Sequence, residues 1–130
     1  MSLVSLNISS NNIGHEGSNY FFLSMKNHPS LTAIDLSNID HIHKNMIGSK
    51  GCINLTKYLQ ENNVVSILNL SGNGIKYDGF DYISDGMMNS KSMVSLNLSR
   101  NEIPKSCIYI ISFINRSSNN FIWITGINII

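Results

Sequence analysis

The residues best suited to chemistry lie in one polar segment, NIDHIHK, which ends at Lys44. It contains Asp40, His41 and His43, and His15 lies at the equivalent place one unit earlier in the chain. Two histidines and a carboxylate can form a zinc triad. The alternative interpretation is a polar loop that contacts a partner, and we favour it because no cysteine or glutamate is nearby to complete a metal site. We therefore expect no metal and no cofactor.

Motifs of catalysis are missing from the sequence. It has no nucleophile elbow, no HExxH, no Walker loop and no paired-cysteine metal motif. GSKG at residues 48–51 contains glycine, serine and lysine, but it lacks the spacing and the terminal Ser/Thr of a phosphate-binding loop. We predict that the protein is not an enzyme.

The elements that position these residues come from a repeated phrase. LNISSNNIG, LNLSGNGI and LNLSRNEI are three copies, and a fourth copy is split by an insertion. The units begin near residues 3, 31, 65, 93 and 121, which are 28, 34, 28 and 28 residues apart. The longer interval reflects six extra residues, which we place within the segment 38–44. The chain therefore consists of about four and a half repeats of 28 residues.

Each unit changes its hydrophobic period halfway. In the first, Leu6 and Ile8 alternate with polar residues, as in a strand buried on one face, whereas Gly17, Phe21 and Met25 are four residues apart, as in a helix. A lone strand and helix cannot bury both apolar faces, so successive units must stack. We predict an α/β solenoid, a curved parallel sheet with helices outside, as a single domain over residues 1–130.

An asparagine follows each of the first four predicted strands, at Asn11, Asn45, Asn73 and Asn101. A buried amide at the end of a strand can donate to and accept from loop backbone groups that would otherwise be unpaired. The four side chains are therefore predicted to form a ladder.

The unit LxxLxLxxNxIxxxGxxxLxxxL resembles the leucine-rich repeat of the ribonuclease-inhibitor type, over about residues 3–130. The resemblance implies a horseshoe-like solenoid and a protein-protein interaction scaffold that binds another protein through its concave sheet face and strand-end loops. The same family includes Ran-type GTPase-activating proteins and actin-filament-capping domains, which are the alternative functions. For the first of these, Asn45, Asn73 and Arg100 are the loop-edge residues to test.

The residues predicted to contact a partner lie on the concave face, at its loop edge or in the insertion. They are Asn7, Asp35, Asp40, His41, His43, Ile67, Asn69, Asn97, Arg100 and Trp123. Trp123 and Arg100 stand out because aromatic and arginine side chains often dominate binding energy. Trp123 has an alternative structural role, which is to fill space beside a missing next unit.

Composition argues against other partner classes. The net charge is +1 and 13% of residues are charged, so no basic surface indicates nucleic acid or an acidic membrane. We see neither a signal peptide nor an apolar run of the ~20 residues that a membrane span needs. We expect a cytoplasmic protein without a membrane-spanning segment.

Two further expectations follow from the stack. Cys52 and Cys107 begin helices two units apart, and adjacent helices lie ~8–10 Å apart, too far for a disulfide, so both are predicted to be free thiols. The fourth helix is apolar around most of its circumference, with Tyr109 and Phe113 outside the inner stripe. Three explanations remain open: a fragment of a longer array, self-association through the apolar C-terminal end, or a tail that folds back as a cap.

Overall fold

The computed structural model describes residues 2–40, 42–117 and 122–127. In these residues the strands are β1 (Ser5–Asn7), β2 (Ala33–Asp35), β3 (Ile67–Asn69), β4 (Ser95–Asn97) and β5 (Trp123–Thr125). They form one parallel sheet in the order in which they occur in the chain. Phe121, where the fifth unit was predicted to begin, lies outside the described residues.

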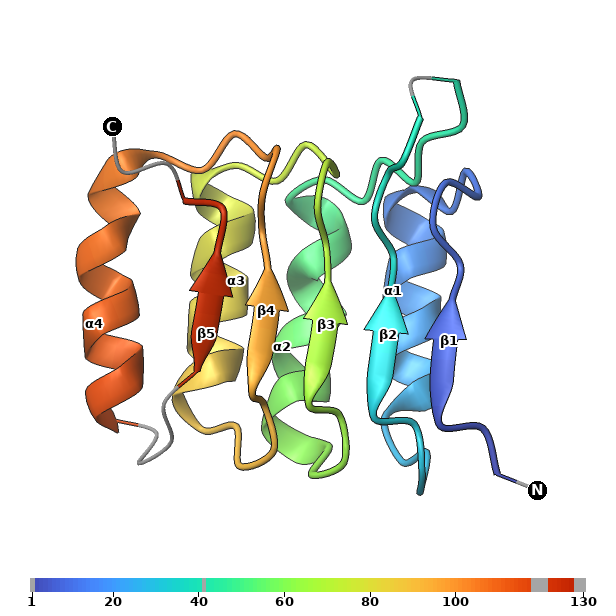
Figure 1. Ribbon diagram of the computed structural model, residues 1–130, viewed down its shortest axis with the longest axis horizontal. Helices are drawn as coiled ribbons and strands as arrows, with labels where there is room; N and C mark the ends of the chain where they lie inside the picture. The colour runs from blue at the N-terminus through green and yellow to red at the C-terminus, as the bar shows by residue number, and fades with distance from the viewer. Residues whose placement is uncertain (1, 41, 118–121, 128–130) are drawn as a thin grey trace.

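The helices cover one face of this sheet and leave the other open (Figure 1). They are α1 (Gly14–Met25), α2 (Ile53–Glu61), α3 (Tyr77–Met88) and α4 (Ile108–Ser117). Short 3₁₀ turns, η1 (Lys50–Cys52) and η2 (Lys105–Cys107), lead into α2 and α4. The predicted α/β solenoid is confirmed, with one strand and one helix in each of the first four units.

The strand register follows the repeat phase. Leu6 pairs with Ile34, Ile34 with Leu68, and Leu68 with Leu96, so equivalent positions lie side by side across the sheet. These central residues point toward the helices, and the exposed fractions of Ile34, Leu68 and Leu96 are at most 2%. Each strand has three residues, so it has one inward residue between two outward ones.

The asparagine ladder is present. Asn45 Nδ2 donates to the carbonyls of Ile8 and Leu36, and its Oδ1 accepts the N–H of Asn11 at 2.7 Å. Asn101 acts in the same way two repeats later, because its Oδ1 accepts the N–H of Asn73 at 2.9 Å. The amides of Asn45 and Asn73 are 0% and 2% exposed. Asn11, in the first unit, is exposed.

A glycine near the start of each of the first three helices could serve to bring the helix close to the sheet. The close contact in the third unit is instead with the preceding unit's loop. A Cβ on Gly79 would lie 2.8 Å from the Cα of Ser49 and 2.7 Å from Cγ2 of Ile75. The glycine therefore sets the spacing between units.

Cys52 and Cys107 are free thiols, as predicted, and both are fully buried. Burial raises the pKa of the Cys52 thiol to about 12, and burial together with the charge of Asp81 raises the pKa of Cys107.

The polar residue Asn115 occupies a position of α4 that is apolar in the other helices, and the reason is structural. Its Oδ1 accepts the N–H of Ile122 at 3.1 Å, which ties the helix to the start of the next strand.

Candidate protein interface

The open face of the sheet is lined by the residues that precede and follow each inward side chain. At the last strand position, Asn7, Asp35, Asn69 and Asn97 each accept, through Oδ1, the N–H of the serine two residues later at 2.9–3.1 Å. These predicted partner contacts therefore also shape their own loops. Because Oδ1 is engaged, the remaining oxygen of Asp35 and the amide nitrogens of the asparagines are the groups left for a partner.

A shallow depression of about 250 Å³ lies on this face over β1, β2 and β3. Its lining includes Ala33, Ile67, Asn69 and the carboxylate of Asp35. Ile67 is 50% exposed, and it is a larger apolar group than the residues at the equivalent positions of β1, β2 and β4, which are Ser5, Ala33 and Ser95. Further along the sheet, Trp123 is 64% exposed and aligns with Ser95 of β4. The structure therefore places Asp35, Ile67 and Asn69 together and Trp123 apart from them.

The insertion forms a loop that extends beyond the other strand-end loops (Figure 1). Asn38 keeps the regular position at its base, because its N–H donates to the carbonyl of Ser71 at 3.0 Å, as the N–H of Ser10 does to that of Ser37. The protruding part, here called the insertion loop, is residues 39–44. The side chain of Asn38 closes it, because Oδ1 accepts the N–H of Asn45 and Nδ2 donates to the carbonyl of Gly72.

Arg100 braces this loop from two units away. Its Nη2 donates to the carbonyl of Asn38 at 2.6 Å, and its Nε donates to Oγ of Ser71 at 3.2 Å. Arg100 has a φ of +55°, in the left-handed region that costs a non-glycine residue energy. On the other side, the N–H of Ile39 donates to Oγ of Ser10 at 2.8 Å. The N-terminal base of the insertion loop, Asn38 and Ile39, is thus held by loops of the first, third and fourth units.

The insertion loop presents apolar side chains to solvent. Ile39 and Ile42 are 70% and 82% exposed, and Met46, just beyond the loop, is 67% exposed. Asp40 holds the loop in shape, since its Oδ1 accepts the N–H groups of Ile42 and His43 at 2.9 and 2.7 Å. The bond from the N–H of His43 lowers the pKa of the Asp40 carboxyl. Exposed apolar groups on a fixed loop are typical of protein contact sites.

The metal hypothesis requires a third ligand beside Asp40 and His43. Oδ2 of Asp40 lies 3.8 Å from Nδ1 of His43. Across the described parts of the chain, no set of three His, Cys, Asp or Glu residues is close enough to hold an ion. His41, the remaining predicted residue of this segment, lies outside the described residues.

The alternative function as a Ran-type GTPase-activating protein depended on three residues at the loop edge. Asn45 and Asn73 are buried in the ladder, with their amides bound to the backbone. Arg100 is exposed, but its guanidinium holds the insertion loop. Sequence reasoning selected Arg100 as a contact residue and missed Asn38, whose role depends on contacts more than 30 residues away.

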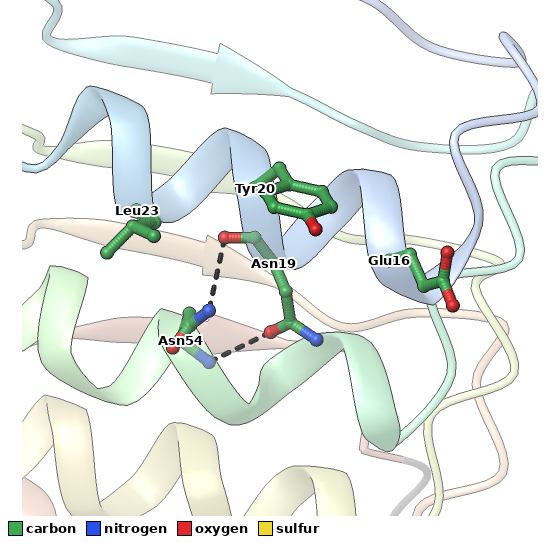
Figure 2. Close-up of a pocket in the computed structure, with 5 residues that line it drawn as sticks. All are labelled: Glu16, Asn19, Tyr20, Leu23 and Asn54. Carbon is green, nitrogen blue, oxygen red and sulfur yellow. Dashed lines mark hydrogen bonds between the residues drawn. The ribbon is translucent and has the colours of Figure 1, made fainter.

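A second type of surface lies between the helices. Figure 2 shows a hollow of about 370 Å³ at α1 and α2, lined by Glu16, Asn19, Tyr20, Leu23 and Asn54. Its two asparagines bond to each other across the helix pair. The N–H of Asn54 donates to Oδ1 of Asn19 at 3.0 Å, and Asn54 Nδ2 donates to the carbonyl of Asn19 at 3.3 Å. This hollow is therefore a hydrogen-bonded seam between two units.

Among the helices of the described residues, none has the length and apolar character to cross a bilayer.

The in-phase sheet and the buried asparagine ladder define a leucine-rich-repeat solenoid. A family model described as "Leucine Rich repeat" matches residues 1–17 and 61–84. Among solved structures, one titled "Leiomodin-1 Actin-Binding Site 2 (ABS2)" superposes with a TM-score of 0.77 at 14% sequence identity, covering 95% of this chain and 69% of that one. No curated protein sequence matches. These findings support a leucine-rich-repeat solenoid as the fold of this chain.

Proposed function

We propose that this chain is a non-catalytic protein-interaction scaffold that binds a partner through the concave sheet face, the strand-end loops and the insertion loop. The observation that carries the proposal is the fixed insertion loop. Three other units hold its base at Asn38 and Ile39, and Asp40 bonds to the backbone within the loop, yet Ile39 and Ile42 remain at least 70% exposed. Such preorganisation reduces the entropy that binding would otherwise cost.

The experiment compares what wild-type protein and an Ile39→Ser/Ile42→Ser variant capture from a cell extract, quantified by mass spectrometry. Both residues are exposed, so the variant should fold as the wild type does. A Tyr20→Ser variant, which changes an exposed residue on the helical side, is the matched control. A partner of the proposed interface is depleted with the insertion-loop variant and retained with the control. Equal capture by all three proteins argues against the proposal.

Actin is the first named partner to test, because the similar solved structure is titled an actin-binding site. That likeness concerns the fold alone, so actin binding needs its own test. In this test the chain is added to pyrene-labelled actin. A capping domain slows growth at filament ends. An unchanged rate, together with no cosedimentation with filaments, removes actin from consideration.

The same proposal includes two narrower assignments. We assign the repeats to the ribonuclease-inhibitor type, because the 28-residue unit contains both a strand and an α-helix. We also assign a cytoplasmic location, which the two free, buried cysteines support. Imaging of a tagged full-length protein tests the location.

A further inference from the structure

Helix α4 has an apolar outer face in addition to the face it buries. Cys107 and Ile114 are at most 1% exposed and pack into the core. Tyr109 and Phe113, one helical turn apart on α4, are 80% and 55% exposed. A helix that only closes a core has polar residues on its outer side. The exposed aromatic pair therefore needs another explanation.

These aromatic residues line a groove of about 300 Å³ between α3 and α4. Tyr109, Ile110 and Phe113 of α4, with Met88 at the end of α3, give it an apolar lining. The α3 side carries two carboxylates, Asp81 and Asp85, which are both exposed and are four residues apart on the helix. The groove thus combines an apolar wall with a row of negative charge.

We propose that this groove binds an amphipathic helix of a partner protein. Apolar side chains of that helix pack against Tyr109 and Phe113, and Lys or Arg residues spaced by four pair with Asp81 and Asp85. Residues spaced by four lie on one helix face, so two parallel or antiparallel helices can match this spacing. Apolar anchors in a groove between helices are a recurrent mode of peptide recognition. The groove lies on the helical side, away from the concave face, so this inference goes beyond the proposed function.

The hollow in Figure 2 provides an internal comparison. It also has exposed apolar groups, Tyr20 and Leu23, at 70% and 55% exposure. However, it carries one carboxylate, Glu16, and its asparagines are bonded to each other across the two helices. The α3–α4 groove has a pair of carboxylates at helical spacing, which is why we assign the partner helix to it.

The test uses two fluorescein-labelled helical peptides, one of leucine and lysine and one of leucine and glutamate with the same pattern. Binding to the full chain is measured by fluorescence anisotropy at physiological ionic strength. We expect the leucine–lysine peptide to bind and the leucine–glutamate peptide not to bind. Asp81→Asn/Asp85→Asn should weaken binding by roughly 2- to 30-fold, the effect of losing two exposed ion pairs. Tyr109→Ser/Phe113→Ser should weaken it at least as much.

The matched control is Glu16→Gln/Tyr20→Ser/Leu23→Ser, which should retain wild-type affinity. All variants change exposed side chains, and far-ultraviolet circular dichroism checks that they fold. Equal binding of both peptides, or an equal loss in the control, overturns the proposal. So does a dimer in sedimentation that Tyr109→Ser/Phe113→Ser abolishes, because a second copy of the chain would then be the occupant.

Discussion

Asn73 is the residue on which the ladder can be tested most sharply. Its Nδ2 donates to the carbonyls of Leu36 and Leu70 at 3.0 and 3.1 Å, and more weakly to that of Ser71 at 3.3 Å. Its Oδ1 accepts the N–H of Ile47 at 3.3 Å. The side chain is 2% exposed, so water cannot replace these bonds without a rearrangement. Asn73→Ala removes all of them.

The size of the loss follows from which groups retain a partner. The carbonyls of Leu36 and Leu70 still accept from Asn45 Nδ2 and Asn101 Nδ2. The N–H of Ile47 has no second acceptor among the described residues. About 1 kcal/mol for each of the two shorter bonds, to the carbonyls of Leu36 and Leu70, plus about 1–3 kcal/mol for the N–H of Ile47 left unpaired, gives a decrease in unfolding free energy of about 3–5 kcal/mol. That is a large share of a typical domain's stability.

Asn11→Ala is the matched control because Asn11 occupies the same slot of the first unit. It is exposed, and its Nδ2 donates to the carbonyl of Ser9 at 2.7 Å. We expect a loss below about 1 kcal/mol. Urea unfolding followed by circular dichroism at 25 °C measures both values. Equal losses in the two variants would refute the idea that burial of the ladder amide determines its contribution.

Four more predictions rest on three side chains, those of Tyr58, Cys52 and Arg100. Tyr58 is fully buried and its hydroxyl has no hydrogen-bond partner among the described residues, so Tyr58→Phe should leave the unfolding free energy unchanged or raise it by roughly 1 kcal/mol, and a clear loss would show a missed partner. Because burial raises the pKa of Cys52 to about 12, its thiol should react with Ellman's reagent at pH 8 roughly 1,000-fold more slowly in the native state than in urea. The same shift means that stability should decline as the pH rises above the unfolded thiol's pKa of about 8.5, because ionisation then favours the unfolded chain; a flat profile contradicts this. Arg100→Ala should speed amide hydrogen exchange in residues 39–44, because alanine at position 100 retains the cost of the left-handed backbone and lacks only the guanidinium. Lys57→Ala is the control and should leave this exchange unchanged.

The sequence was sufficient to predict the sheet order, register and ladder because these features recur in phase. Every unit places an apolar residue at the strand centre. Asn follows at the same distance in the first, third and fourth units, and in the second unit it follows the insertion. Stacking equivalent positions then leaves one parallel arrangement. The physical information is local and repeated, so no long-range contact had to be guessed.

The brace on the insertion loop could not be predicted in this way. Arg100, Gly72 and Ser10 occupy one slot of the repeat and have positive φ angles, whereas Asn38, in the same slot, does not. The chain therefore leaves the repeat path at Asn38, and Arg100 reaches it across 62 residues. A slot with four different residue types gives no pattern from which to infer such a contact.

A similar limit applies where each helix returns to the next strand. His28, Asn62 and Ser90 occupy equivalent positions, and each accepts the N–H of the first residue of the following unit through Nδ1, Oδ1 or Oγ. An imidazole, an amide and a hydroxyl therefore accept the same backbone hydrogen bond in three different units. The repeat consensus hides this function because it depends on an acceptor atom and not on one residue type.

Hydrogen–deuterium exchange of the chain, with and without a partner captured as described above, tests the central claim most directly. The claim is that a partner occupies the concave face and the insertion loop. It predicts slower exchange in residues 33–44, 67–72 and 95–100 on binding, with α1 and α2 unchanged. Protection confined to the helices, with the strands and the insertion loop exchanging as in the free chain, would contradict it.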